Sequence, residues 1–303
     1  MSSKVRVATT WLQSCSGCHI SFLDMHEDLL QVLQHVDILY SPIVDVKEVP
    51  HADVGIIEGA VGNEDNEEML KTFRERCKTI IAFGTCACFG GISGLRNLFH
   101  LEDVLSRGYV ETESTVNGRV PAGSDLPKLQ KTVRPINQVV PVDYLLPGCP
   151  PLPSVIRDTL LALVEGRPLE VKTRNLCHEC DRTKDKMLVA TRDFITDSVV
   201  SPHELATIDP ALCFLEQGVL CLGPATCEGC NGRCLKGNMP CRGCMGPTPD
   251  ALEQGAKSIN ALSSILPAGA LMFQEDIVGA GYRYSLPVSI FPHLARNRRL
   301  ANE

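Results

Sequence analysis

The segment Thr79–Cys88 (TIIAFGTCAC) decides the fold, because a short apolar run stops there at a Gly-Thr-Cys turn. Its first part, Thr79–Phe83, has the length and the β-branched residues of a buried strand. Similar apolar runs recur through the first half of the chain, and each is expected to form a strand. These runs are Lys4–Thr10, Asp37–Val44, Asp53–Glu58 and Val142–Leu146.

Segments with apolar residues at helical spacing separate these runs. Ser21–Val36 is predicted to be one helix with Ser21 as its N-cap, and Ser154–Val164 to be another. Asn63–Arg76 is predicted to be a helix whose acidic residues lie near its positive N-terminal end. Residues 95–140 have no clear period and are expected to form an irregular insertion. Strands that alternate with helices predict a parallel, doubly wound α/β sheet.

Cysteines follow three of the predicted strands. Cys15 and Cys18 follow the first strand, Cys86 follows the fourth, and Cys149 follows the fifth. Parallel strands present their carboxyl ends at one edge of the sheet, where ligands bind. Four thiolates are the usual ligands of a [4Fe–4S] cluster, which we predict at this edge. For the Cys15/Cys18 pair taken alone, a zinc knuckle or a redox dithiol is the alternative.

Each of these loops also has a glycine beside its cysteine. We expect these glycines to let backbone N–H groups approach the cluster sulfurs, and such hydrogen bonds help to set the reduction potential. The glycines are Gly17, Gly84 and Gly148.

The alternating pattern is lost from about Lys172 onward, so we predict domains at residues 1–170 and 171–303. The stretch Cys177–Cys244 is crowded with Gly, Pro and Cys, and metal ligation would supply the folding energy that its small apolar content lacks. The spacing gives two sets of four thiols, for which zinc is an alternative to two neighbouring clusters. The sets are Cys177, Cys180, Cys213 and Cys221, and Cys230, Cys234, Cys241 and Cys244.

Three cysteines remain outside these sets. Cys77 is expected to be a buried apolar thiol. Cys88 is expected near the first cluster without binding it. Cys227 lies between Cys221 and Cys230 and could replace either of them as a ligand.

The composition excludes several classes of protein. The net charge of −7 and the pI of about 5.7 argue against nucleic-acid binding, which needs a basic surface. No apolar stretch approaches the roughly 20 residues of a membrane helix. The beginning of the chain has neither a long apolar signal region nor a twin-arginine segment, so we expect a cytoplasmic protein. In a reducing cytosol, fifteen cysteines indicate metal binding or redox chemistry rather than disulfides.

The first domain has four short motifs, three of which contain cysteine: CSGC at 15–18, EG at 58–59, GTCACFGG at 84–91 and PGCPP at 147–151. A fifth, LCFLEQGVLCLGPATCEGCNGRCLKGNMPCRGCMGP, spans 212–247. In type and order these motifs resemble the small subunits of [NiFe] hydrogenases. The resemblance implies a flavodoxin-like domain with the proximal cluster beside the nickel–iron site of a large subunit, and a C-terminal domain with two more clusters. It assigns the first four thiols to the proximal cluster, the set beginning at Cys177 to the distal one and the set beginning at Cys230 to the medial one.

Departures from the family pattern refine these expectations. Many members have His at the position of Cys177 and Pro at that of Cys234, so this chain is expected to hold three all-cysteine [4Fe–4S] clusters of low potential. Oxygen-tolerant members have extra cysteines where this chain has Gly17 and Gly91. The chain looks most like the cytoplasmic group, and within it the F420-non-reducing subunits that dock on heterodisulfide reductase. The expected acceptor module is thus of the heterodisulfide reductase or ferredoxin-like type, or a flavin-containing F420 or NAD(P) module.

Other residues near the first motif are expected to have supporting roles. Glu58 is interpreted as a carboxylate that bonds the cluster loops or the subunit interface, and His19 and His26 as interface or surface residues. The alternatives to a hydrogenase subunit are the cluster subunit of NADH dehydrogenase, which has adjacent ligand cysteines and no C-terminal cluster domain, and a multi-zinc protein.

Overall fold

The computed structural model describes residues 4–185, 208–265 and 276–290. They form two compact units. One contains the described residues up to Leu169 together with the short η8 turn, Leu286–Val288, and the other contains those between Glu170 and Ser285. The η8 turn thus packs in the first unit although it follows the second in sequence. Gln138 donates a hydrogen bond to the Pro287 carbonyl of this turn over 3.2 Å.

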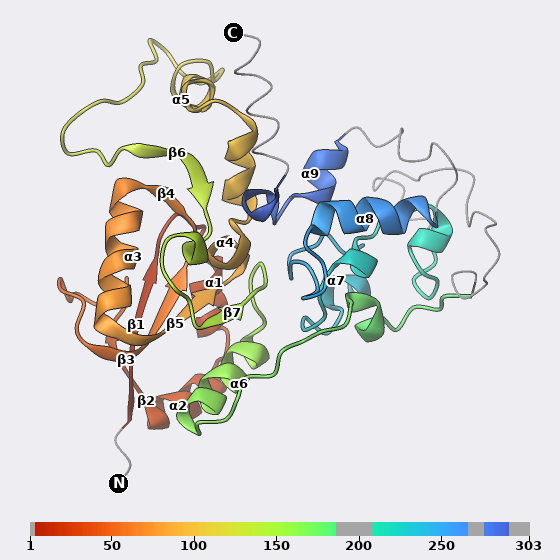
Figure 1. Ribbon diagram of the computed structural model, residues 1–303, viewed down its shortest axis with the longest axis horizontal. Helices are drawn as coiled ribbons and strands as arrows, with labels where there is room; N and C mark the ends of the chain where they lie inside the picture. Colours follow the sequence, from red (N-terminus) through yellow and green to blue (C-terminus); the bar gives the residue numbers. More distant parts are fainter. Residues whose placement is uncertain (1–3, 186–207, 266–275, 291–303) are drawn as a thin grey trace. The chain divides into compact units, whose positions relative to one another are not determined.

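Within the described residues of the first unit, five parallel strands form one sheet in the order β2-β1-β3-β5-β7 (Figure 1). Numbered along the chain, these strands follow the order 2-1-3-4-5, which is the flavodoxin-like arrangement. The predicted parallel α/β fold is therefore confirmed. The strands are β1 Val5–Trp11, β2 Val36–Tyr40, β3 Ala52–Glu58, β5 Cys77–Phe83 and β7 Tyr144–Leu146.

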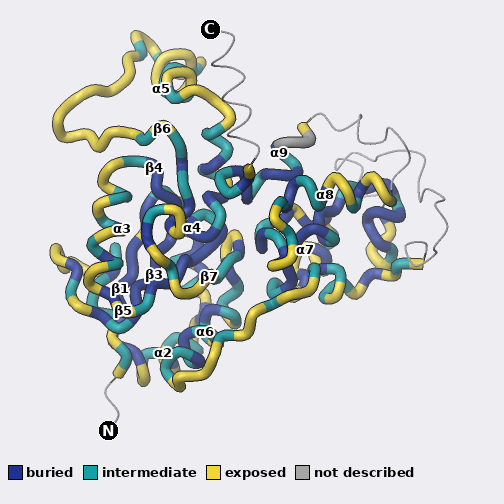
Figure 2. The backbone as a smooth tube through the Cα atoms, in the orientation of Figure 1, coloured by how far each residue is buried: buried dark blue, intermediate teal, exposed yellow. Residues whose placement is uncertain are grey.

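Helices cover both faces of this sheet, because alternate residues of each buried strand point to opposite sides. On one face, Leu70 and Phe73 of α3 (Glu64–Arg76) pack with α4 (Thr85–Phe89). On the other face, Val32 of α2 (Glu27–His35) and Ile156 of α6 (Pro153–Val164) form a second apolar cluster. The burial colours of Figure 2 follow this arrangement, with the central strands dark and the outer helix faces exposed.

The prediction of one helix over Ser21–Val36 is wrong. The segment forms α1 (Gly17–Leu23) and α2, which are separated by a turn where His26 has a φ of 50°. Ser21 is not an N-cap: it lies within α1, and its buried hydroxyl donates to the Pro151 carbonyl over 2.6 Å. The apolar spacing is thus real, but it belongs to two short helices that face the same core.

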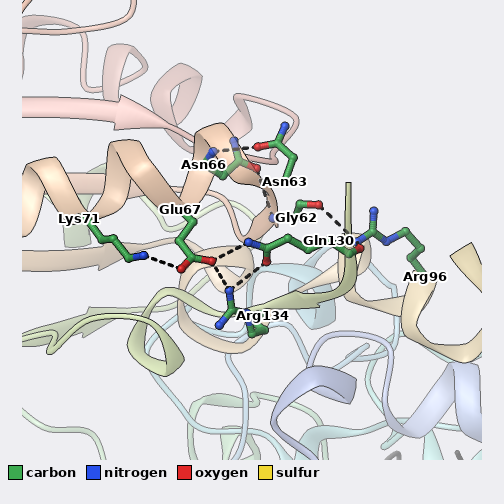
Figure 3. Close-up of polar contacts among 8 residues, drawn as sticks. All are labelled: Gly62, Asn63, Asn66, Glu67, Lys71, Arg96, Gln130 and Arg134. Atoms are coloured by element: carbon green, nitrogen blue, oxygen red, sulfur yellow. Dashed lines mark hydrogen bonds and ion pairs between the residues drawn. The ribbon is translucent and has the colours of Figure 1, made fainter. Parts of the chain in front are cut away.

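The predicted helix at Asn63–Arg76 is confirmed as α3. The side chain of Asn63 caps it by accepting the N–H of Asn66 over 2.8 Å. Glu67, one turn further, accepts hydrogen bonds from Lys71, Gln130 and Arg134 over 2.6–2.7 Å (Figure 3). These contacts fasten α3 to a segment more than sixty residues away in sequence.

The prediction that residues 95–140 are irregular is wrong in part. The region contains α5 (Leu101–Tyr109) and β6 (Leu129–Arg134), and β6 pairs antiparallel with β4 (Val61–Asn63). Asn97, in the 3-10 turn η1 (Ile92–Leu98), donates to the carbonyl of Val133 and accepts its N–H, both over 2.8 Å. A short two-stranded pair of this kind depends on such tertiary contacts, which leave no periodic signal in the sequence.

The second unit has only short elements in its described residues. Its apolar cluster combines Phe214, Leu215 and Leu222 with the thiols Cys213 and Cys221. No helix among the described residues of the chain is long and apolar enough to cross a membrane. The elements are the 3-10 turns η3 Leu176–Glu179, η5 Leu215–Gln217 and η6 Gly223–Ala225, and the helices α7 Arg233–Lys236, α8 Gln254–Ser263 and α9 Ile277–Gly281.

Candidate metal centres

Four strands of the sheet end in one row. Trp11 pairs with Glu58, Glu58 with Phe83, and Phe83 with Leu146, so the last residues of β1, β3, β5 and β7 are in register. The order of the strands reverses between β1 and β3, which is where ligands bind in open α/β sheets. The loops that leave this row carry the first four predicted ligands.

These four thiols lie close enough to affect one another's ionisation. Burial raises the pKa of the Cys18 thiol above its ordinary value, and the Glu58 carboxylate and the thiols of Cys86, Cys149 and Cys15 raise it further. Burial, then Cys86 and Cys15, raises the pKa of Cys149 to about 11. Four thiols that disfavour each other's negative charge suit a cation centre, whose binding displaces their protons.

Glycines keep space open beside these sulfurs. A Cβ atom at Gly84, where φ is +84°, would lie 2.2 Å from the sulfur of Cys18. A Cβ atom at Gly91 would lie 2.5 Å from the sulfur of Cys86. The backbone of Thr85 donates to the Gly148 carbonyl over 3.0 Å, which ties the Cys86 and Cys149 loops together. The glycines therefore form a cradle that side chains would fill.

Glu58 holds the first ligand loop in place. Its side chain, only 1% exposed, accepts the backbone N–H groups of Cys18 over 3.3 Å and of His19 over 3.1 Å. The interpretation of Glu58 as a carboxylate that bonds a cysteine loop is confirmed.

His19 is not a surface residue, because its side chain is 14% exposed and its ring joins an internal network. The ring lies between Glu58 and Thr9, with 2.5 Å from Nδ1 to the carboxylate and 2.5 Å from Nε2 to the hydroxyl. Sequence reasoning missed Thr9 because a threonine inside a strand carries no signal of this role. His26 is exposed, as expected.

In the second unit, the set beginning at Cys177 also comes together. Burial raises the pKa of Cys177 to about 11, and the thiols of Cys213 and Cys180 contribute, against the lowering effect of Lys184. Burial raises the pKa of Cys221 to about 12, with Cys177 and Cys213 again among the causes. A Cβ atom at Gly223 would lie 3.3 Å from the Cys177 sulfur and 3.6 Å from that of Cys221, so this set has a glycine cradle too.

In the set beginning at Cys230, the contacts of the described residues join the four cysteines in two pairs. Cys234 lies in α7 and Cys230 three residues before this helix, and the charge of Cys234 contributes to the raised pKa of Cys230. Cys241 and Cys244 form the second pair. The backbone N–H of Cys241 also contacts the sulfur of Cys221 over 3.3 Å, so the two sets of the second unit are neighbours.

The three leftover cysteines occupy less favourable surroundings for ligation. Cys77 is buried in the apolar core, as predicted. Cys88 is buried too, and its thiol donates to the Ala82 carbonyl over 3.3 Å. Cys227 donates to the Lys172 carbonyl over 3.5 Å, and after burial the carboxylates of Glu228 and Glu179 are the main causes that raise its pKa. All fifteen cysteines lie in described residues and are free thiols.

The described thiols are not arranged to bind a single metal ion. Among the described residues, no three His, Cys, Asp or Glu side chains lie close enough to hold one metal ion. A zinc ion bound at about 2.3 Å by each sulfur would need them about 4 Å apart. In a [4Fe–4S] cluster each thiolate binds a different iron, so the sulfurs stand further apart. The space that the glycines leave beside Cys18, Cys86 and Cys177 suits this larger group.

Comparisons with solved structures define the class of the protein. One chain of the NAD+-reducing [NiFe]-hydrogenase in the H2-reduced state has a TM-score of 0.54 and 38% identity, over 55% of this chain and 95% of that chain. A chain of the Dm. baculatum [NiFeSe]-hydrogenase has a TM-score of 0.50 at 19% identity, over 82% of this chain and 97% of that chain, and shows the shared fold alone. The fold and the thiols at its strand ends are those of a hydrogenase electron-transfer subunit.

Sequence comparisons give the family. The G subunit of the F420-non-reducing hydrogenase of Methanothermobacter marburgensis is 38% identical over 306 residues, which cover 96% of this chain and 97% of that protein. The delta subunit of the NAD-reducing hydrogenase HoxS of Cupriavidus necator is 42% identical over 172 residues, 55% of this chain and 82% of that protein. Residues 15–163 match the family described as NADH ubiquinone oxidoreductase, 20 Kd subunit. The chain belongs to the family of F420-non-reducing hydrogenase G subunits.

Family membership decides between the classes predicted from the motifs. The chain is a subunit of a [NiFe]-type hydrogenase, an oxidoreductase that acts on H2, as the resemblance implied. The match to the NADH ubiquinone oxidoreductase family ends at residue 163, whereas the Methanothermobacter relative extends over nearly the whole chain. The NADH dehydrogenase and multi-zinc alternatives are therefore not favoured.

Proposed function

We propose that this chain relays electrons from a nickel–iron site on a partner large subunit, through three [4Fe–4S] clusters, to an acceptor module. The observation that carries the proposal is that the ends of β1, β3, β5 and β7 are in register. The loops that follow three of these strands bring together the thiols of Cys15, Cys18, Cys86 and Cys149, whose charges affect one another. We propose the proximal cluster in the domain 1–170 and the other two in 171–303.

The two thiol sets of the second domain complete the proposal. Cys177, Cys180, Cys213 and Cys221 would hold the distal cluster, and their mutual effect on ionisation supports this grouping. The contact of Cys241 with Cys221 supports a medial cluster directly beside the distal cluster. Its ligands would be Cys230, Cys234, Cys241 and Cys244.

When bound, a [4Fe–4S] cluster supplies reversible one-electron transfer. The chain's own contribution is to hold and surround it. Glu58 fixes the amide groups of the first ligand loop, and the glycine positions leave room beside the sulfurs. The apolar cluster around Phe214 and Leu222 shields the thiols of Cys213, Cys221 and Cys241 from water, which affects the reduction potential.

An apolar surface beside the proximal ligands supports a large-subunit partner there. Trp11, Ile20, Leu23 and Ile43 are exposed large apolar side chains. They line a hollow of about 200 Å³, to which Ser16 of the first motif also contributes. An exposed apolar patch of this kind is typical of an interaction site. We therefore place the hydrogenase large subunit on this surface.

The acceptor is proposed from the relatives. Relatives that match 96% of this chain are named F420-non-reducing hydrogenase subunits. The NAD-reducing relative matches only 55% of this chain. The F420-non-reducing names argue against an F420 module, and among the remaining types we prefer the heterodisulfide reductase type that the resemblance of the sequence motifs implies. Fifteen free cysteines are in keeping with a reducing compartment, and we propose that the complex is cytoplasmic.

Metal analysis of the anaerobically purified complex tests the proposal. Three cubanes contribute about 12 irons and about 12 sulfides per chain beyond those of the partner subunits, with a broad absorption band in the visible range. About four irons per chain would leave only the proximal cluster. A colourless chain loaded with zinc would overturn the proposal. The acceptor is tested separately, by identifying every protein that co-purifies with the native complex.

A further inference from the structure

Arg182 is a buried cation in the second unit. Its side chain is only 7% exposed, although it lies two residues after Cys180 in a cysteine loop. Its guanidinium donates to the carbonyls of Asp209 over 3.1 Å and Leu212 over 2.7 Å, and to the side-chain oxygen of Asn238 over 2.5 Å. Its Nε atom is buried and has no hydrogen-bond partner among the described residues.

None of these described partners carries a negative charge at the contacting atom. A guanidinium remains protonated under all ordinary conditions. The carbon of the guanidinium lies 3.8 Å from the centre of the Phe214 ring, and this cation–π contact compensates only part of the lost hydration. Within the described ranges no carboxylate forms an ion pair with Arg182, and a buried charge without an opposite one is costly, so this guanidinium suits an anionic group beside it.

The contacts of Arg182 converge on the proposed cluster ligands. Leu212 and Phe214 flank Cys213 in sequence, so the guanidinium contacts the chain on both sides of that thiol. Asn238 lies in the turn that follows α7, where the N–H of Met239 donates to the Cys234 carbonyl over 2.9 Å. Arg182 therefore joins the Cys180, Cys213 and Cys234 loops.

We propose that Arg182 is a fixed counter-charge of the cluster held by Cys177, Cys180, Cys213 and Cys221, and that it raises the reduction potential of this cluster. The inference rests on the proposed function. Four thiolates around a [4Fe–4S] core give the centre a net negative charge, which grows by one on reduction. A desolvated cation nearby stabilises the reduced form more than the oxidised form. Arg182 thus opposes the lowering of the potential that all-cysteine ligation produces.

The test compares Arg182→Lys, which keeps the charge, with Arg182→Gln, which keeps hydrogen-bond donors without charge. The native complex is titrated anaerobically and followed by electron paramagnetic resonance. We expect Arg182→Gln to shift the reduction equilibrium of this cluster at least tenfold toward the oxidised form, which is about 59 mV for one electron. Arg182→Lys should keep most of the wild-type potential. Lys257→Met, which removes a cation of the same unit on α8 and outside the cysteine motifs, is the matched control and should leave this potential unchanged.

Each result decides the proposal. An unchanged potential in an iron-replete Arg182→Gln variant overturns it, and so does an equal shift in Arg182→Lys, because a hydrogen-bonding clamp alone would then explain the residue. If Arg182→Gln fails to assemble this cluster, iron content decides: a counter-charge predicts that Arg182→Lys retains iron, whereas a neutral clamp predicts that both variants lose it. Wild-type protein without cubane iron would instead refute the proposed function itself.

Discussion

The carboxylate of Glu58, at the end of β3, accepts the backbone N–H of Cys18, at the start of α1, across 40 positions of sequence. The same carboxylate accepts the N–H of His19 and contacts its ring. The first turn of a helix has N–H groups without intrahelical partners, and a buried carboxylate is a strong acceptor for them. The cysteine loop after β1 is thereby held by the neighbouring strand of the sheet.

We predict that Glu58→Gln loosens this loop. An amide side chain can place only one oxygen against two N–H groups and a ring, and a buried unsatisfied donor costs about 1–3 kcal/mol. A local loss of about 2 kcal/mol corresponds to about 30-fold faster amide hydrogen exchange at Cys18 and His19. Glu68→Gln, on the exposed side of α3, is the control and should leave exchange at both amides unchanged. Equal exchange rates in the two variants would contradict the role of Glu58.

We predict that Gly84→Ala removes one cluster. The new Cβ would lie 2.2 Å from the Cys18 sulfur, and the φ of +84° strains any residue other than glycine. The iron content should fall by about four per chain, the content of one cubane. Gly123→Ala is the matched control, because a Cβ there meets nothing within 4 Å. Full iron retention in Gly84→Ala would contradict the requirement for open space beside the Cys18 sulfur.

We predict that Cys234→Pro converts the medial centre to a three-iron form. Cys234 lies in the first turn of α7, where a backbone N–H has no intrahelical partner, so proline is tolerated there. About one iron per chain should be lost, because one of the four cluster irons loses its thiolate, and the oxidised protein should give a three-iron paramagnetic resonance signal. A variant with its full iron content and no such signal would show that the medial assignment of Cys234 is wrong.

We predict that Glu67 stabilises the first unit above acidic pH. Hydrogen bonds from Lys71 and Gln130 and the charge of Arg134 lower its pKa from 4.5 to about 2 (Figure 3). Because the folded pKa lies below the unfolded one, the stabilisation is fully present above pH 4.5 and is lost as the pH falls toward 2. Glu67→Gln should lower the free energy of unfolding by about 1 kcal/mol at neutral pH, since the group is partly exposed.

The difference between wild type and Glu67→Gln should shrink between pH 4.5 and 2, as measured by denaturant unfolding at each pH. Glu68→Gln again serves as the control on the same helix. A difference that stays constant through this range would rule out ionisation of Glu67 as its source.

We predict that charged residues in the apolar surface beside the first motif weaken binding of the large subunit. Ile20→Lys and Leu23→Lys each place a charge where a partner would bury an apolar side chain, which is worth about 1.5–3 kcal/mol. Binding should weaken at least about tenfold in a pull-down titration. Leu252→Lys, at an exposed apolar residue of the second unit, is the control. Unchanged binding in both surface variants would place the large subunit elsewhere.

Local sequence patterns were sufficient for the sheet. Apolar runs of strand length that alternate with helical segments predicted the parallel α/β fold, and the acidic segment after Asn63 predicted α3 together with its start. Because strands of such a sheet end at one edge, the positions of Cys15, Cys86 and Cys149 relative to the strands also predicted that their thiols would meet. These features depend on residues close in sequence and on rules that hold for every parallel sheet.

Tertiary structure decided the rest. The break at His26 between α1 and α2, the pairing of β4 with β6, and the uncharged described partners of Arg182 all depend on residues far apart in the chain. So do the contacts of Glu58 with the first cysteine loop. Sequence alone predicted which thiols gather at the sheet edge, because the position of each cysteine directly after a strand is a local feature. Which polar groups surround them was decided only by folding, because a buried charge or carboxylate takes its partners from whatever segments pack against it.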